Sequence, residues 1–408
     1  MSSYEHESLQ HRTIRTLSAA QIGAGIGTAG TVAAGSLLVA SITGSEELAG
    51  LAQTFSVLGA AALAIPLARL TSRGGRRTAL SFGYAAGVLG SFLAIFGGIN
   101  SNVYLMLSGS FLVGSASASG YQARFAAIDL VPEAHRAKQL SYVVWGSTVG
   151  AVTGPNLMQP AGNVAEYFGL PRLVGPYMIS ALTLTFASIL IFTFLKPDPY
   201  LTALGEGKRY EAGKKHVKEA LSHIWHKPIA LFAILSIAIG HVAMIAVMVM
   251  TPVHMAHVDV SLKIIGLVIS VHVIGMYAFS PLVGSISDRL GKVRTIQVGL
   301  LILLSSTIVA GTAKADDIFR LGIGLFLLGL GWSFTLIAGS ALLSSSVDAT
   351  LKTSVQGASD LTMNLAGAVG GAIAGVIISS FSYGWLCLFA AIPVLTVGIW
   401  SVSFKSFK

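Results

Sequence analysis

Histidine and methionine gather in one short part of the chain. Residues 241–276 hold four of its ten histidines and five of its ten methionines: His241, His254, His257, His272, Met244, Met248, Met250, Met255 and Met276. Imidazole and thioether groups are ligands that suit Cu(I), whereas magnesium, calcium and manganese prefer oxygen ligands. The apolar runs 228–252 and 262–284 contain no aspartate or glutamate. This chemistry favours binding of a copper ion, as a transported substrate rather than a resident cofactor.

The spacing of these residues predicts two ligand-bearing helix faces. His241, Met244 and Met248 are three and seven positions apart, so they share one face of a helix. His272 and Met276 are four positions apart and share a face of the next helix. If these helices cross a membrane in opposite directions, His241 and His272 both lie about 15 Å from its outer boundary, near the midplane. We therefore expect the two faces to meet at one depth.

The same residues permit other interpretations. Methionine often fills gaps in apolar cores, and a histidine inside a membrane can carry a proton or contact an organic substrate. His254, Met255 and His257 are predicted to lie in the outer loop between the two helices. There they form either a capture site for the ion or an ordinary solvated loop.

The elements that must position these side chains are membrane-spanning helices. The chain has 408 residues, of which 53% are hydrophobic and 11% charged, against about 25% charged in soluble domains. A helix needs about 20 mostly apolar residues to cross the hydrocarbon. Twelve such runs occur, near 17–42, 47–70, 78–98, 102–128, 139–159, 173–195, 228–252, 262–284, 295–312, 318–343, 356–380 and 383–403. The predicted fold class is an all-α integral membrane protein of twelve transmembrane helices in two six-helix halves.

The distribution of basic residues predicts the orientation. Of the 26 lysines and arginines, 21 lie in the two tails and the loops on the side of the termini. Because cytoplasmic loops are enriched in lysine and arginine, both termini are expected in the cytoplasm and the protein in the cytoplasmic (inner) membrane. The net charge of +9 is then a property of the membrane face, and we expect no nucleic-acid partner.

The longest polar stretch divides the spans six and six. The predicted parts are a cytoplasmic tail (1–16), a first half (17–195), a central cytoplasmic loop (196–227), a second half (228–403) and a cytoplasmic tail (404–408). Such a duplicated unit is common in secondary transporters. There is no P-loop, HExxH motif or nucleophile elbow, and the central loop is too short for a catalytic domain, so an enzyme is not expected.

A short loop is repeated in the two halves. The stretch GSISDRLGKVRT contains Gly284, Asp288, Arg289, Gly291 and Lys292. Here Gly291 permits a tight turn, and the charged pair can bind neighbouring helix ends across a closing gate. This run resembles the cytoplasmic loop signature G-x-x-x-D-R-x-G-R/K of the major facilitator superfamily, and the resemblance covers essentially the whole chain.

The first-half copy of the loop, ARLTSRGGRRT, departs from that signature. Ala68 and Ser72 stand where the signature has glycine and aspartate. We therefore expect a weaker latch in the first half.

The two ligand-bearing faces are similar to those of one branch of that superfamily. Met244-x-x-x-Met248 and His272-x-x-x-Met276 resemble the paired motifs of the CcoA-type copper importers. The resemblance implies copper import for assembly of cbb3-type cytochrome oxidase, with these four residues as ligands; His241 is added only from its helical phase. The expected partners are the copper ion and the lipid bilayer, with the protein a monomer.

Two charged residues inside predicted spans suggest a rival function. Arg124 and Asp360 are candidates for proton coupling, because ionisable groups within a membrane are costly and mark functional sites. A purely structural alternative pairs Arg124 with Asp129, about one turn further along. The rival is a proton-coupled efflux antiporter for drugs or small metabolites.

Overall fold

The regular structure of the chain is helical. This computed structural model describes residues 3–45, 48, 50–205, 222, 224–256 and 262–404. The helices are α1 (Ser3–Thr43), α2 (Leu51–Ile99), α3 (Val103–Ala126), η2 (Glu133–His135), α4 (Arg136–Asn156), α5 (Met158–Tyr167), η3 (Arg172–Val174), α6 (Gly175–Phe194), α7 (Pro199–Leu204), α9 (Pro228–Ala256), α10 (Leu262–Val273), the π-helical turn η4 (Ile274–Ala278), α11 (Ser280–Leu290), α12 (Lys292–Gly311), α13 (Ile318–Ser345), α14 (Lys352–Ser380), α15 (Tyr383–Ser401) and η5 (Val402–Phe404).

The helices agree with the predicted spans. Within the described ranges nine helices are long and apolar enough to cross a membrane, or ten if the bent pair ending in α11 counts as one span. The 49-residue α2 covers two predicted spans, because it is interrupted at Gly75, where φ is 83° and ψ is 174°. Only the predicted span 139–159, in the glycine- and polar-rich α4, falls short of that apolarity. The all-α membrane fold is confirmed.

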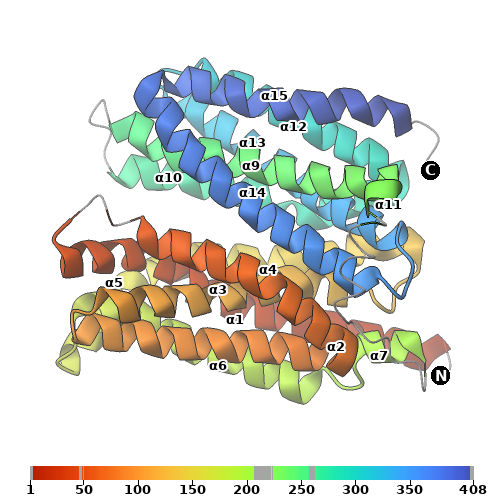
Figure 1. Cartoon of the computed structure of the whole chain (residues 1–408), viewed down its shortest axis with the longest axis horizontal. Helices are drawn as coiled ribbons and strands as arrows, with labels where there is room; N and C mark the ends of the chain where they lie inside the picture. The colour runs from red at the N-terminus through yellow and green to blue at the C-terminus, as the bar shows by residue number, and fades with distance from the viewer. Residues whose placement is uncertain are drawn as a thin grey trace. The chain divides into compact units, whose positions relative to one another are not determined.

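Unit 1, the first of two compact units, comprises Met1–Val131, Gly146–Glu219 and Ala349–Leu361. Its α2 packs along α3 and α6, and α1 packs along α6 (Figure 1). Small residues permit this close packing. A Cβ at Gly59 of α2 would overlap the carbonyl oxygen of Phe111 on α3, and Gly25 of α1 meets Gly150 of α4 backbone to backbone.

Unit 2 comprises Pro132–Trp145, Ala220–Asp348 and Thr362–Lys408. Its central element is α13, against which α9, α10, η4, α11 and α12 all pack, while α15 lies along α9 and α12 (Figure 1). The side chains of Leu325, Leu328 and Trp332 on α13 are buried. A helix apolar on all sides is expected at such a central place.

The two units do not coincide with the two halves of the sequence. The segment Pro132–Trp145 comes from the first half but packs in unit 2, and Ala349–Leu361 comes from the second half but packs in unit 1. Both segments lie at helix ends that the charge distribution predicts to be cytoplasmic. Each unit therefore contains, at that end, a short segment of the other half of the sequence.

Candidate functional site

The signature loop of the second half holds the start of α4. Gly291 makes the tight turn between α11 and α12 with φ of 94°. The Asp288 carboxylate accepts hydrogen bonds from the backbone N–H groups of Ala137, at 3.1 Å, and Lys138, at 2.9 Å. These are N–H groups that the first turn of a helix leaves without intrahelical partners, and a carboxylate also suits the positive end of the helix. Arg289, expected to share this role, is exposed, because successive helical residues point in different directions.

Two further contacts close this junction within unit 2. A Cβ at Gly284 would meet the backbone of α4 and the hydroxyl of Ser141, so the absence of a side chain lets α11 touch α4. Lys292 donates hydrogen bonds to the Glu133 carboxylate at 2.7 Å and to the Ser345 hydroxyl at 3.0 Å. The hydrogen bond from Lys292 is the chief reason that the pKa of Glu133 lies below its usual value.

The first-half copy uses a different set of contacts. Ser72 donates to the carbonyl oxygen of Arg69 in its own helix and to no other residue of the described ranges, so the missing aspartate is not replaced at that position. Instead Arg76 donates to Asp129 at 2.8 Å and to Gln356 of α14 at 2.7 Å. The Arg76 and Asp129 side chains are each only 1% exposed.

Lys352 of α14 adds an ion pair to the same carboxylate, 3.3 Å from Asp129. The expectation of a weaker first-half latch rested on Ala68 and Ser72 alone, and it missed this network. The sequence carried one signal for it: the loop repeat aligns Arg76 with Lys292. Nothing in it marked Gln356 or Lys352 as partners.

A second buried ion pair lies in unit 1, further into the predicted span. The Arg124 guanidinium of α3 is 2.6 Å from the Asp360 carboxylate of α14, and both side chains are at most 2% exposed. The guanidinium also lies over the ring of Phe125, 4.6 Å from its centroid. The alternative pairing of Arg124 with Asp129 is wrong, because Asp129 is bound by Arg76.

The two histidines of the predicted metal site contact α13 at different places. Trp332 donates its indole N–H to Nδ1 of His241 at 3.1 Å. Nδ1 of His272 lies 2.7 Å from the carbonyl oxygen of Leu325, so this nitrogen carries the proton and donates. Leu325 and Trp332 are two helical turns apart, or about 10 Å along the axis. The ligand-bearing faces were expected to meet, but α10 and η4 pack mainly on α13 and scarcely touch α9.

The methionines of the two faces are divided in the same way. Met244 is buried on α9 and Met248 is partly exposed, whereas Met276 is buried in η4. There is no room for a side chain at Gly329 of α13, because the backbone of His272 and of Met276 passes against it. The π-helical turn η4 begins two residues after His272, and such turns often mark functional sites. Among the described residues no group of three or more histidine, cysteine, aspartate or glutamate side chains could hold a metal ion.

The predicted outer capture site is mostly helical. Because α9 continues to Ala256, His254 and Met255 lie in its last turns and not in a loop. The His254 ring stacks on Tyr383 with centroids 4.3 Å apart, and Met255 is fully buried. His257 lies outside the described residues.

The comparisons with known proteins show which family this arrangement belongs to. The family model described as Major Facilitator Superfamily matches residues 17–262 and 242–406. The chain belongs to the major facilitator superfamily. As a member it is a multi-pass membrane transporter and not an enzyme.

Full-length relatives of this superfamily member occur in Bacillus subtilis (strain 168). The protein named "Uncharacterized MFS-type transporter YdeG" is 36% identical over 405 residues, covering 98% of this chain and 94% of that protein. A more distant relative, "Riboflavin transporter RfnT" of Brucella anthropi, is 24% identical over 333 residues, covering 81% of this chain and 80% of its own.

Solved structures support the same fold. The Escherichia coli fucose:proton symporter FucP matches with a TM-score of 0.73 at 16% identity, covering 97% of this chain and 98% of its own. A bacterial homologue of the iron transporter ferroportin matches with a TM-score of 0.73 at 12% identity, covering 98% and 99%. At these identities the likeness concerns the fold alone.

Proposed function

We propose that this chain is a proton-coupled transporter of a small organic solute in the cytoplasmic membrane, with both termini in the cytoplasm. The observation that carries the proposal is the ion pair between Arg124 and Asp360. Ionisable side chains at membrane depth are costly, and in transporters they mark proton relays. Asp360 is the group that would accept and release the proton.

The pair links proton binding to the position of a helix. With Asp360 ionised, the pair ties α3 to the cytoplasmic end of α14. Opposite charges attract strongly in the low-dielectric interior, so the ionised pair resists separation. Protonation removes the attraction, while the Arg124 guanidinium keeps its contact with the ring of Phe125. A proton on Asp360 therefore permits α14 to move away from α3.

The contacts of Arg76 form a second tie on the same end of α14. Arg76 binds Gln356 directly, and Lys352 binds Asp129. Protonation of Asp360 leaves these contacts unchanged. Separation of α14 from α2 and α3 consequently requires both ties to break. Proton binding to Asp360 weakens only the first tie, so it does not open the protein when no solute is bound.

The substrate class rests on one relative. That protein, which covers about four fifths of the chain, is named for riboflavin. Organic solutes of this kind need hydrogen-bonding and aromatic groups rather than a metal-ligand cluster. In unit 2 the partly exposed ring of Tyr277 meets the buried ring of Trp332 edge to face, with their centroids 5.6 Å apart.

Proteoliposomes loaded with a pH-sensitive dye test the proposal. Organic solutes, beginning with riboflavin, are added and the resulting proton movement is recorded. We expect a transported solute to move protons in the unaltered protein. Asp360→Asn should abolish this movement but retain solute exchange at equilibrium, which requires no proton release. The matched control is Asp316→Asn, which alters an exposed carboxyl group. Undiminished proton movement with Asp360→Asn would refute the proposal.

Copper import is the second candidate, and one observation favours it. Because Nδ1 of His272 donates to the Leu325 carbonyl, its Nε2 carries the lone pair, and this buried atom has no hydrogen-bond partner among the described residues. Metal-binding histidines are commonly oriented by such a bond from the other ring nitrogen. The test is accumulation of radioactive copper in cells, comparing the unaltered protein with His272→Ala/Met276→Ala and Met244→Ala/Met248→Ala. Loss of copper accumulation in both variants supports copper import, and accumulation unchanged from that of the unaltered protein would refute it.

A further inference from the structure

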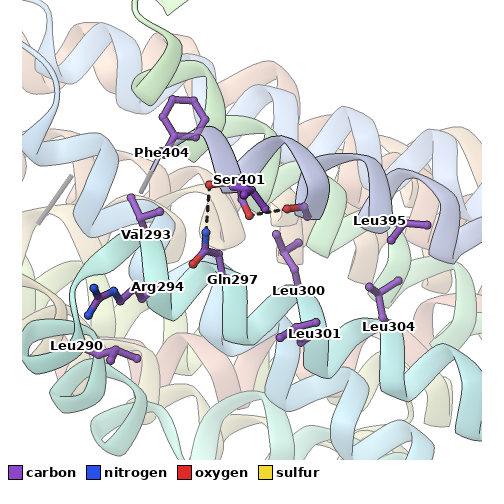
Figure 2. Close-up of a pocket in the computed structure, with 12 residues that line it drawn as sticks. Leu290, Val293, Arg294, Gln297, Leu300, Leu301, Leu304, Leu395, Ser401 and Phe404 are labelled. Atoms are coloured by element: carbon purple, nitrogen blue, oxygen red, sulfur yellow. Dashed lines mark hydrogen bonds between the residues drawn. The ribbon is translucent and has the colours of Figure 1, made fainter. Parts of the chain in front are cut away.

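An open groove lies on unit 2 between α12 and α15. Its cavity volume is about 630 Å³, which is within the range of sites that bind small molecules. Figure 2 shows leucines from both helices directed into it, including Leu300, Leu301, Leu304 and Leu395. The groove is therefore apolar along most of its length.

The groove is open because α15 has a glycine there. A Cβ at Gly398, which lines the groove, would meet nothing within 4 Å. Elsewhere on α12 the packing is closed: a Cβ at Gly299 would lie 2.7 Å from the Cβ of Phe334. The space beside Gly398 is thus large enough for a side chain that the protein itself does not supply.

One end of the groove carries a positive charge. Arg294 lines it and is exposed, and none of the ion pairs found between described residues involves it. The other polar groups are already used. Gln297 donates its amide to the carbonyl oxygen of Ser401 at 3.0 Å, and the Ser401 hydroxyl donates to the carbonyl oxygen of Gly398 (Figure 2). An occupant with an anionic group at this end would have the Arg294 guanidinium to bind.

The surroundings of the groove are those of a lipid-facing surface. Leu301 is 64% exposed and Leu395 is 50% exposed, on helices that qualify as membrane spans. Exposed apolar side chains on such helices face lipid tails. Arg294 lies three residues after the turn at Gly291, at the end that the charge distribution predicts to be cytoplasmic. The cytoplasmic leaflet carries anionic headgroups, which attract basic side chains at this depth.

We propose that the groove between α12 and α15 binds one anionic phospholipid, with its headgroup phosphate on Arg294 and an acyl chain along Leu301, Leu304 and Leu395. Guanidinium and phosphate form charge-assisted hydrogen bonds. The leucines hold the acyl chain in preference to bulk lipid only where that chain fits the shape of the groove. This site is independent of the transported solute.

Native mass spectrometry of the full chain tests this assignment. The protein is purified in detergent with equimolar phosphatidylglycerol and phosphatidylethanolamine, and retained lipid is identified by mass. We expect one phosphatidylglycerol per protein. Arg294→Gln should reduce the preference for phosphatidylglycerol about fivefold, the effect of one basic residue at an anionic surface. Gly398→Leu fills the groove and should abolish retention of either lipid.

Matched variants at the other end of the spans serve as controls. Arg320 is exposed near the start of α13, and a Cβ at Gly322 would also meet nothing within 4 Å. Arg320→Gln and Gly322→Leu should leave lipid retention unchanged. Gly398→Ala, which adds a single methyl group, provides a milder version should the leucine variant fail to fold.

Three results would overturn the assignment. Equal retention of both lipids that Arg294→Gln does not alter would exclude headgroup recognition. Lipid retention that survives Gly398→Leu in a folded protein would place the lipid elsewhere. A dimer mass that Gly398→Leu abolishes would make the occupant a second copy of this chain.

Discussion

Replacing Asp288 tests whether its hydrogen bonds to the start of α4 hold α4 against α11. The carboxylate accepts two backbone N–H groups, from Ala137 and Lys138. Removing a side chain that caps a helix start costs about 0.5–2 kcal/mol, and the loss of a charge from that position adds about 0.3–1 kcal/mol. A net loss of about 1–2 kcal/mol corresponds to a shift of roughly 5- to 30-fold towards the separated state. Asp288→Ala should produce this shift.

A single introduced cysteine can report the separation. Ser141 of α4 is fully buried and lies against Gly284 of α11. The native thiol, Cys387, is replaced by serine, Ser141→Cys is introduced, and its alkylation rate is measured in inside-out vesicles. Asp288→Ala should raise that rate about 5- to 30-fold. Asp288→Asn should also raise it, because the two bonds use both carboxylate oxygens and an asparagine amide has only one acceptor oxygen. An unchanged rate with alanine or with asparagine would refute the reasoning.

Two other substitutions test one contact in each unit. Gly59→Ala places a methyl group on the carbonyl oxygen of Phe111; overpacking costs about 1–3 kcal/mol, so the melting temperature of the purified protein should fall, and a value equal to that of Gly322→Ala would contradict this. The lowered pKa of Glu133, caused chiefly by the hydrogen bond from Lys292, means that their contact contributes stability above the unfolded-state pKa of about 4.3 and loses it as the pH falls through the folded-state value. Glu133→Gln should therefore lower the melting temperature slightly near pH 7 and progressively less as the pH falls through the folded-state pKa, and a loss that does not change with pH would show that charge is not the cause.

Features that depend on a few neighbouring residues could be predicted from the sequence. Hydropathy over about 20 residues predicts a span, because the bilayer imposes that length. The turns at Gly75 and Gly291, with φ of 83° and 94°, follow from the need for glycine where φ is positive. The repeat that relates these two loops was visible because it preserves local chemistry.

Partners that are distant in the sequence could not be predicted. Arg124 and Asp129 are five residues apart, yet Arg124 pairs with Asp360, 236 positions away, and Asp129 pairs with Arg76. Each charge had several eligible partners, and only the packing of α14 against α2 and α3 decides among them. Helical phase likewise does not predict which neighbouring helix packs against a given face.

The metal-binding hypothesis shows the same limit. The i, i+4 spacing of His272 and Met276 was sufficient to place both near one face, but the π-helical turn that begins at Ile274 changes the local phase. Nor does spacing reveal that His241 and His272 both form hydrogen bonds with α13, at positions two turns apart. Consecutive spans were assumed to be neighbours, and here the intervening helix comes later in the chain.

Two segments, Pro132–Trp145 and Ala349–Leu361, pack in the unit formed mainly by the other half of the sequence, and this affects how the protein folds during synthesis. The first turn of α4 emerges from the ribosome about 150 residues before Asp288, the side chain that accepts its N–H groups. Until then water must solvate that turn, as it must solvate Arg76 before Gln356 arrives. These ends of α2 and α4, which the charge distribution predicts to be cytoplasmic, therefore lack their later partners through much of translation, and we expect chaperones and membrane proteases to act on them. In a truncated chain that ends at the central loop, the first turn of α4 and the Arg76 side chain would lack these partners permanently.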